Sequence, residues 1–91
     1  MRAIERTTKF KRDYKREKKT DAELDGALIA VIELLASDAE LPERLRDHAL
    51  SSDWKGFRDC HVRPDLVLIY AKVGNDTLSL VRLGSHSELF G

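Results

Sequence analysis

The apolar residues of this 91-residue chain change their spacing once, near Gly56. Before that point, the apolar residues of 24–35 recur every three or four positions, which places them along one side of a helix. After it, apolar and polar residues alternate or form the short run LVLIY at 66–70, as they do in strands. We therefore expect an α+β fold, in which two N-terminal helices pack on a small, largely antiparallel sheet.

The first helix is expected after a short, weakly patterned strand at residues 2–6. The threonines at 7–8 can cap a helix that continues to about Lys19. In this helix Phe10 and Tyr14 lie four residues apart, so they form a narrow apolar stripe that can anchor the helix beneath a basic face.

A capping box is expected to begin the second helix. Residues 20–23 read Thr-Asp-Ala-Glu, in which the hydroxyl and the carboxylate can each accept a hydrogen bond from a free amide. The two helices then form an antiparallel hairpin. The helical spacing stops at 38–42, and residues 41–53 are interpreted as an irregular connection with room for one helical turn.

The second half of the chain is expected to form three strands. In residues 57–62 the odd-numbered side chains face one side of the sheet and the even-numbered ones the other. Arg-Pro-Asp at 63–65 predicts a turn, and the apolar run 66–70 suits a strand that is buried on both faces. A second turn at 74–76 leads into a last strand at 77–83.

Composition and charge bound the function classes. Residues 1–91 are expected to form one small domain in the cytoplasm, because the chain has a single cysteine, Cys60, no apolar signal segment and no run of membrane-spanning length. The net charge is zero, but residues 1–20 carry nine Lys/Arg and three Asp/Glu, whereas residues 21–53 carry two and nine. The basic segment fits a polyanion partner, or a solvated helix face, which is the more usual reading of a charge run taken alone.

Three histidines and one aspartate are candidates for catalysis. His48, His61 and His86 lie at element boundaries or strand ends, and Asp65 lies at the hairpin corner between them in sequence. If they share a cleft, they suit metal-free cleavage of RNA. A base removes the 2′-hydroxyl proton, the oxygen attacks the adjacent phosphorus, and an acid protonates the departing 5′-oxygen. An imidazole with a reference pKa of about 6.5 can act in either role.

Three further residues are candidates for substrate binding. Lys55 or Arg82 can offset the charge that grows on the phosphorus oxygens, and Phe90 can stack on an unpaired base. Each also has a structural explanation, since Arg82 can pair with Asp59 across the sheet and Phe90 can pack against the core.

The histidines and Asp65 have structural explanations too. His61 can be a half-buried, hydrogen-bonded strand residue, His48 a solvent-exposed loop residue, and Asp65 an ordinary turn residue. A zinc site of Cys60, His61, Asp65 and His86 matches no known ligand spacing, and neighbouring strand residues point to opposite faces. We therefore predict no metal site and no cofactor.

The segment DHALSSDWKGFRDCHVRPDLVLIY, followed by VRLGSHSELFG, resembles the YafQ-like branch of the RelE/ParE superfamily, the toxins of type II toxin–antitoxin modules. The resemblance is specific in residues 47–91 and general in residues 1–46. It implies one RelE/ParE-like domain that enters the decoding site of the ribosome and cuts messenger RNA there without a metal.

The resemblance also implies roles and partners. By position, the catalytic residues of the family fall on His48, His61, Asp65, His86 and Phe90. Asp65 is assigned as general base and His86 as general acid, two roles that can be exchanged, and the other histidines hold or neutralise the phosphate. The implied partners are the 70S ribosome with messenger RNA and a cognate antitoxin, through which the complex binds operator DNA.

Two other functions remain open from the sequence. Some members of the superfamily poison gyrase, although they lack this set of histidines. A toxin that has lost its activity would instead survive as a module that binds its partner and regulates its own operon.

Overall fold

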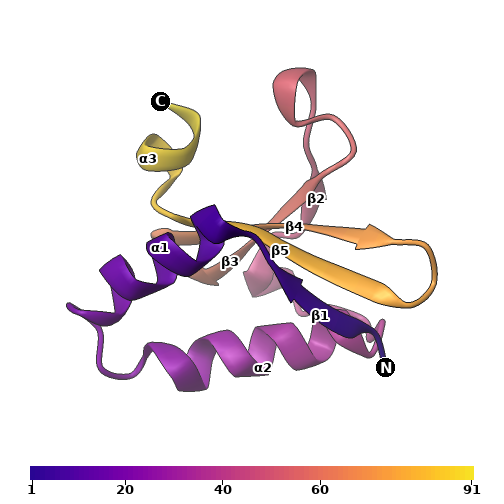
Figure 1. Ribbon diagram of the computed structural model, residues 1–91, viewed down its shortest axis with the longest axis horizontal. Helices are drawn as coiled ribbons and strands as arrows, with labels where there is room; N and C mark the ends of the chain where they lie inside the picture. Colours follow the sequence, from indigo (N-terminus) through magenta and orange to yellow (C-terminus); the bar gives the residue numbers. More distant parts are fainter.

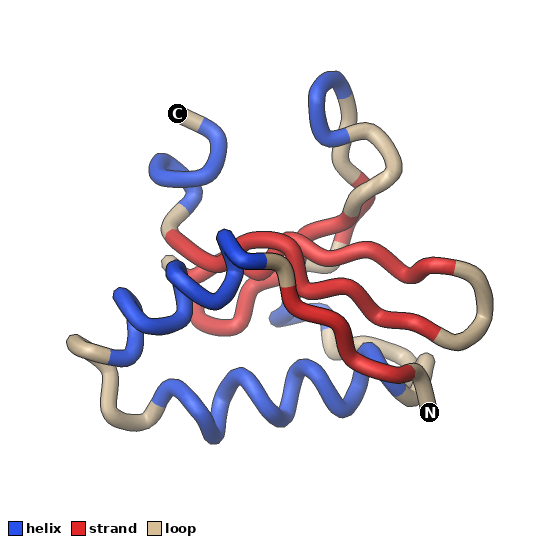
Figure 2. Tube along the Cα trace, viewed as in Figure 1, coloured by secondary structure: helices blue, strands red, loops and turns tan.

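The structure, a computed structural model, describes residues 1–91 as one five-stranded sheet with helices on both sides (Figures 1 and 2). Two helices, α1 and α2, belong to the N-terminal half, and the expected α+β architecture is confirmed. No helix is long and apolar enough to cross a membrane. The elements are β1 (Ala3–Arg6), α1 (Thr8–Lys18), α2 (Leu24–Ala36), the 3₁₀ turn η1 (Glu43–Leu45), β2 (His48–Ala49), the 3₁₀ turn η2 (Ser52–Trp54), β3 (Arg58–Arg63), β4 (Leu66–Val73), β5 (Thr77–Gly84) and α3 (His86–Phe90).

The sheet has the strand order β1-β5-β4-β3-β2. Strands β2 to β5 are antiparallel to their neighbours, and β1 is parallel to β5, with Ala3 opposite Thr77. The two expected hairpin turns are present, at 64–65 and 74–76. The first strand of the chain is thus paired with the last.

Strand β4 separates two apolar clusters. Leu66, Leu68 and Tyr70 pack with α1 and α2, whereas Val67 and Ile69 pack on the opposite face against α3 and η2. All five are buried, which confirms that this run is covered on both sides. Strand β3 follows the same alternation, because Cys60 belongs to the helix-side cluster and Phe57 to the other. Asp59 and His61 therefore face away from α2.

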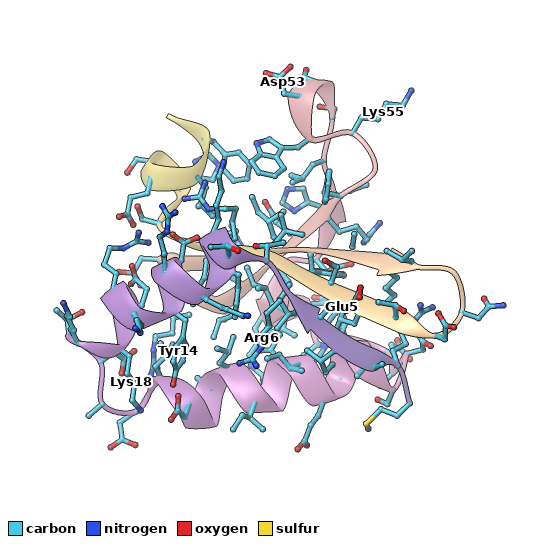
Figure 3. All side chains as sticks on the ribbon, viewed as in Figure 1. Glu5, Arg6, Tyr14, Lys18, Asp53 and Lys55 are labelled. Atoms are coloured by element: carbon cyan, nitrogen blue, oxygen red, sulfur yellow. The ribbon has the colours of Figure 1, made fainter.

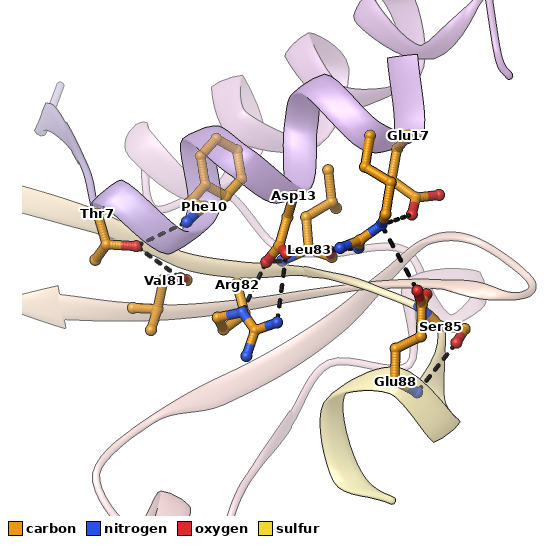
Figure 4. Close-up of polar contacts among 10 residues, drawn as sticks. Thr7, Phe10, Asp13, Glu17, Val81, Arg82, Leu83, Ser85 and Glu88 are labelled. Carbon is orange, nitrogen blue, oxygen red and sulfur yellow. Dashed lines mark hydrogen bonds and ion pairs between the residues drawn. The ribbon is translucent and has the colours of Figure 1, made fainter. Parts of the chain in front are cut away.

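Helix α1 completes the edge of β5 beyond the end of β1 (Figure 4). Thr7 caps the helix by accepting from the Phe10 amide at 3.0 Å, and its hydroxyl donates to the Val81 carbonyl at 2.7 Å. The buried carboxylate of Asp13 accepts from the Leu83 amide at 3.0 Å, and Arg16 donates to the Leu83 carbonyl at 3.0 Å. Side chains of α1 therefore satisfy the backbone groups that β1 is too short to reach.

The capping box expected at residues 20–23 does not form. The helix begins at Leu24 with no side-chain cap, because Asp21 binds Arg63 of β3 at 2.6 Å and the Glu23 amide at 3.1 Å. The Thr20 hydroxyl donates instead to the Glu17 carbonyl. A charge-assisted bond to the sheet outweighs the local cap.

The connection expected to be irregular, residues 41–53, contains more structure than one helical turn. It has the turn η1, the two-residue strand β2 and the start of η2. Helix α3 has no counterpart among the elements predicted from the sequence. Its five residues are too few to show a helical repeat, and its signal is a capping box, in which Ser85 and Glu88 bind each other's backbone amides at 2.9 and 3.2 Å.

Candidate functional site

Two segments rise from the sheet face opposite α2, one formed by β2 and η2 and the other by α3 (Figure 1). Apolar side chains at their bases pack on β4 and β5 and so fix both segments. Leu89 is the buried anchor of α3, and Trp54 is the aromatic anchor of η2. The histidines at the start of β2 and at the start of α3 are positioned by these segments.

A buried carboxylate, Asp59, lies in β3 beneath the histidines. It is 1% exposed and lies directly across the strand pair from His48, whose Nδ1 is 3.0 Å from Asp59 Oδ1. The same nitrogen lies 2.9 Å from the Arg46 carbonyl oxygen, to which it is hydrogen-bonded. Because one ring nitrogen carries at most one hydrogen, Asp59 Oδ1 is left without a hydrogen bond.

The environment of Asp59 raises its pKa above the usual value for an aspartate. Burial is the main cause, since it disfavours the charged form. Positive charge on His48, His61 and His86 acts in the opposite direction. All three histidines therefore lie close enough to one buried carboxylate to influence its charge.

His61 and Asp65 occupy the two sides of the β3–β4 turn. The His61 Nδ1 lies 3.1 Å from the Pro64 carbonyl oxygen, which fixes the ring next to the turn. Asp65 is exposed and forms no side-chain hydrogen bond or ion pair. Val67 pairs with Gly84, so Asp65 and His86 extend beyond the same end of the β4–β5 ladder. No hydrogen bond or ion pair joins Asp65 to a histidine.

The C-terminal helix brings His86 and Phe90 together. They are four residues apart on α3, and their ring centroids are 4.8 Å apart. Phe90 also meets the edge of Trp54 at 6.3 Å, and Trp54 meets Phe57 at 5.6 Å. Phe90 is only partly buried, so it joins the aromatic cluster and still reaches the surface beside His86.

The two candidate cations lie differently. Lys55 is exposed near the outer end of the η2 segment, and its side chain points away from the body of the protein (Figure 3). Arg82 does not pair with Asp59, as one interpretation of the sequence suggested. Its Nε donates to Asp13 of α1 at 2.7 Å, because that buried carboxylate lies against the end of β5 (Figure 4).

Sequence reasoning did not select Asp59 or Trp54 as site residues. The alternation in β3 places Asp59 on the face of His61, and an acid on an otherwise apolar sheet face is the signal that could have identified it. Trp54 gave no comparable signal, because its place beside Phe90 depends on two segments that are far apart in the chain.

No group of three or more His, Cys, Asp or Glu side chains comes together in a way that could hold a metal ion. Cys60 is fully buried on the helix side of the sheet, and burial raises the pKa of its thiol to about 12. The four residues considered for zinc are therefore not gathered around one point.

Comparisons with known proteins place the chain in a family. Residues 2–91 match the family model described as bacterial toxin of type II toxin–antitoxin system, YafQ. The mRNA interferase toxin YafQ of Escherichia coli (strain B / BL21-DE3) is 38% identical over 91 residues, which is 100% of this chain and 98% of that protein.

Solved structures show the same fold. A crystal structure of the E. coli DinJ-YafQ complex matches with a TM-score of 0.86 and 39% identity, covering 100% of both chains. A crystal structure of a metal-bound toxin from Helicobacter pylori matches with a TM-score of 0.86 and 45% identity, covering 99% of this chain and 100% of that one. With a family match over nearly its whole length and relatives of this similarity, the chain belongs to the YafQ family of toxins from type II toxin–antitoxin systems.

Proposed function

We propose that this toxin is an endoribonuclease that cuts messenger RNA in the A site of translating ribosomes in the cytoplasm, and so stops translation. Its E. coli relative is named an mRNA interferase, and the present site contains groups suited to that reaction. The observation that carries the proposal is that His48 lies 3.0 Å from buried Asp59, while His86, against Phe90, follows the end of β5 that pairs through Val67 with His61.

The proposed reaction is a proton-coupled transfer that needs no metal. The general base, assigned to Asp65, takes the proton of the ribose 2′-hydroxyl as that oxygen bonds to the adjacent phosphorus. The bond from phosphorus to the 5′-oxygen breaks, and the general acid, assigned to His86, gives that oxygen a proton. The products are a 2′,3′-cyclic phosphate and a 5′-hydroxyl. The reverse assignment of acid and base uses the same two groups.

The remaining site residues are proposed to hold the substrate. His48, on β2, and His61, on β3, hold or neutralise the scissile phosphate. Asp59 is a positioning residue, because its Oδ1 lies 3.0 Å from Nδ1 of the His48 ring on the neighbouring strand. Phe90 stacks on an unpaired base, as exposed aromatic rings do in RNA recognition.

The two cations would act at different places. Arg82 keeps part of its guanidinium unbound while Asp13 holds the rest, so it is proposed to offset charge on the phosphorus oxygens. Lys55 points outward and is proposed to meet the RNA backbone outside the reaction centre.

Mapped cleavage ends of a translated message test the proposal. The unaltered protein should produce cuts only when ribosomes are translating, and His86→Ala should lower the cutting rate about a hundredfold or more. Asn75→Ala, in the exposed β4–β5 turn, serves as the control and should cut normally. Cutting by His86→Ala or Asp65→Ala at the unaltered rate would remove that residue from the mechanism. Broken DNA with intact messages would instead point to gyrase.

The proposed partners include a cognate antitoxin that restrains the toxin and carries the complex to operator DNA. The support is the E. coli relative, whose crystal structure is that of a DinJ-YafQ complex. Expression of the toxin with its neighbouring gene should recover a small protein bound to it, and the complex, but not the toxin alone, should bind operator DNA. Recovery of the toxin without any small partner would contradict the proposal.

A further inference from the structure

A hollow of about 510 Å³ lies next to the candidate site and shares His61 with it. Residues of η1, with Arg46 directly after it, form one wall. The end of β3 and the β3–β4 turn form the other. We call it the arginine hollow. Its lining includes Arg44, Leu45, Arg46, His61, Arg63 and Pro64.

Two of its three arginines carry charge that no protein group offsets. Arg63 is held by Asp21 through bonds of 2.6 and 3.1 Å. Arg44 and Arg46 are exposed, and neither side chain forms an ion pair or hydrogen bond. They are also the only two cations in residues 21–53, a segment with nine acidic residues. The two unpaired positive side chains of this acidic segment therefore lie together in the arginine hollow.

The backbone that carries these arginines is fixed. Leu45, between them, is 3% exposed and belongs to the helix-side core. Arg46 has a left-handed backbone, with φ of 50°, which is uncommon for a residue with a side chain. Its amide donates to the Glu43 carbonyl at 2.9 Å, and its own carbonyl accepts from the His48 ring at 2.9 Å. An uncommon backbone conformation whose amide and carbonyl are both hydrogen-bonded indicates a position that the fold keeps in place.

We propose that the arginine hollow binds a backbone phosphate of the RNA substrate, next along the strand to the phosphodiester that is cut. This inference rests on the proposed function, because His61 lines the hollow and also belongs to the reaction centre. Arginine presents a fork of donors that matches two phosphate oxygens, and a site with two such side chains on a fixed backbone is already organised for one phosphate. The bond between Arg46 and His48 couples this site to the histidines.

The test is binding of a hexanucleotide RNA with 2′-O-methyl riboses to the isolated full-length toxin, followed by fluorescence anisotropy at several salt concentrations. The methyl groups prevent cleavage, so the result does not depend on catalysis or on ribosomes. The variant Arg44→Gln/Arg46→Gln should weaken binding about tenfold and reduce the slope of log affinity against log salt by about 0.7 for each phosphate that is no longer neutralised. Arg44→Lys/Arg46→Lys should restore the salt slope but only part of the affinity.

The control Arg6→Gln/Lys9→Gln removes two exposed charges from β1 and the first turn of α1, and β1 is separated from β3 by two strands of the sheet. It should bind the probe with nearly unchanged affinity. Equal affinity and slope for the unaltered protein and Arg44→Gln/Arg46→Gln would overturn the inference, as would absence of probe binding by the unaltered protein. An unaltered protein that binds the probe but does not cut a translated message would instead count against the proposed function. Thermal unfolding checks that each variant is folded.

Discussion

At the scale of single residues, the most unusual feature is a buried acid whose oxygen lacks a hydrogen bond. Asp59 accepts no hydrogen bond at its buried Oδ1, and its one ion-pair contact is with the exposed His48 ring at 3.0 Å. Buried groups that lower the stability of the fold and have no structural role are concentrated at functional sites. Asp59 thus indicates that this end of the sheet is organised for chemistry.

The variant Asp59→Asn should be more stable and less active than the unaltered protein. The raised pKa of Asp59 means that the folded state binds this proton more tightly than the unfolded state, so the contribution of Asp59 to stability falls as pH rises above its ordinary value of 3.8. At neutral pH the amide should raise the free energy of unfolding by about 1 kcal/mol, as measured in urea. Message cutting should fall at least tenfold.

Asp53→Asn is the matched control, because Asp53 is exposed at η2 and points away from the body (Figure 3). Asp53→Asn should change neither the free energy of unfolding nor the rate of message cutting. A destabilised Asp59→Asn protein would show that the carboxylate has a structural role instead.

The sequence carried much of the residue-level information. The order of His48, His61, Asp65 and His86 was sufficient to select them, because they form a motif. Their surroundings were not predictable, since the pairing of His48 with Asp59 follows from a two-residue strand that has no pattern of its own. Likewise, Arg82 could not be assigned to Asp13 before the path of α1 across β5 was known.

At the scale of elements, α3 is the shortest α-helix and carries two of the candidate site residues, His86 and Phe90. Its start is held by the capping box of Ser85 and Glu88, so Ser85→Ala should cost about 1 kcal/mol locally and loosen His86 and Phe90. Hydrogen exchange at the Glu88 and Leu89 amides should become faster, and message cutting should decrease.

Ser51→Ala provides the control, because Ser51 is an exposed serine before η2 whose side chain caps no helix. Its amide exchange should match that of the unaltered protein. Unchanged exchange in Ser85→Ala would mean that packing of Leu89 alone holds the helix in place.

Helix α1 should depend on one buried carboxylate. Asp13 accepts bonds from Arg82, Arg16 and the Leu83 amide, so Asp13→Ala should lower the free energy of unfolding by about 3 kcal/mol in urea at pH 7. The exposed Lys11→Ala on the same helix should change it by less than about 0.5 kcal/mol.

The effect of Asp13 should also depend on pH. Burial would raise its pKa, but the bonds from Arg82 and the Leu83 amide outweigh burial and lower it. The stabilisation by Asp13 is therefore complete above the ordinary value of 3.8 and is lost as pH falls through the lowered folded value. The difference between Asp13→Ala and the unaltered protein should accordingly shrink in strong acid, and a constant difference would argue against an ionised Asp13.

Elements with a long repeat were predictable and those without one were not. The apolar repeat of α2 and the run in β4 identified both elements, whereas the predicted start of α2 was wrong because Asp21 is used by Arg63 of a distant strand. Helix α3 and the two 3₁₀ turns are each shorter than the window in which a period can be recognised. Their existence depends on tertiary contacts, such as burial of Leu45 and Leu89.

At the scale of the whole molecule, Arg2 joins three parts of the fold. Its amide donates to the end of α2 at Ala36, and its guanidinium binds Asp38 and the Gly74 and Thr77 carbonyls at 2.9 to 3.1 Å. Arg2→Ala should lower the free energy of unfolding by about 2 kcal/mol, measured by urea titration. Arg6→Ala, whose side chain is exposed and unbonded, is the control and should have little effect. Equal stability of the two variants would show that the backbone pairing of β1 suffices.

The pairing of β1 with β5 has a consequence for how the toxin is made. Residues 3–6 find their partners at 77–80, so during synthesis the earliest strand must wait for a segment that is made more than seventy residues later. Helix α3 emerges later still. A nascent chain therefore completes its sheet, and then the helix that carries His86 and Phe90, only after these late segments have left the ribosome.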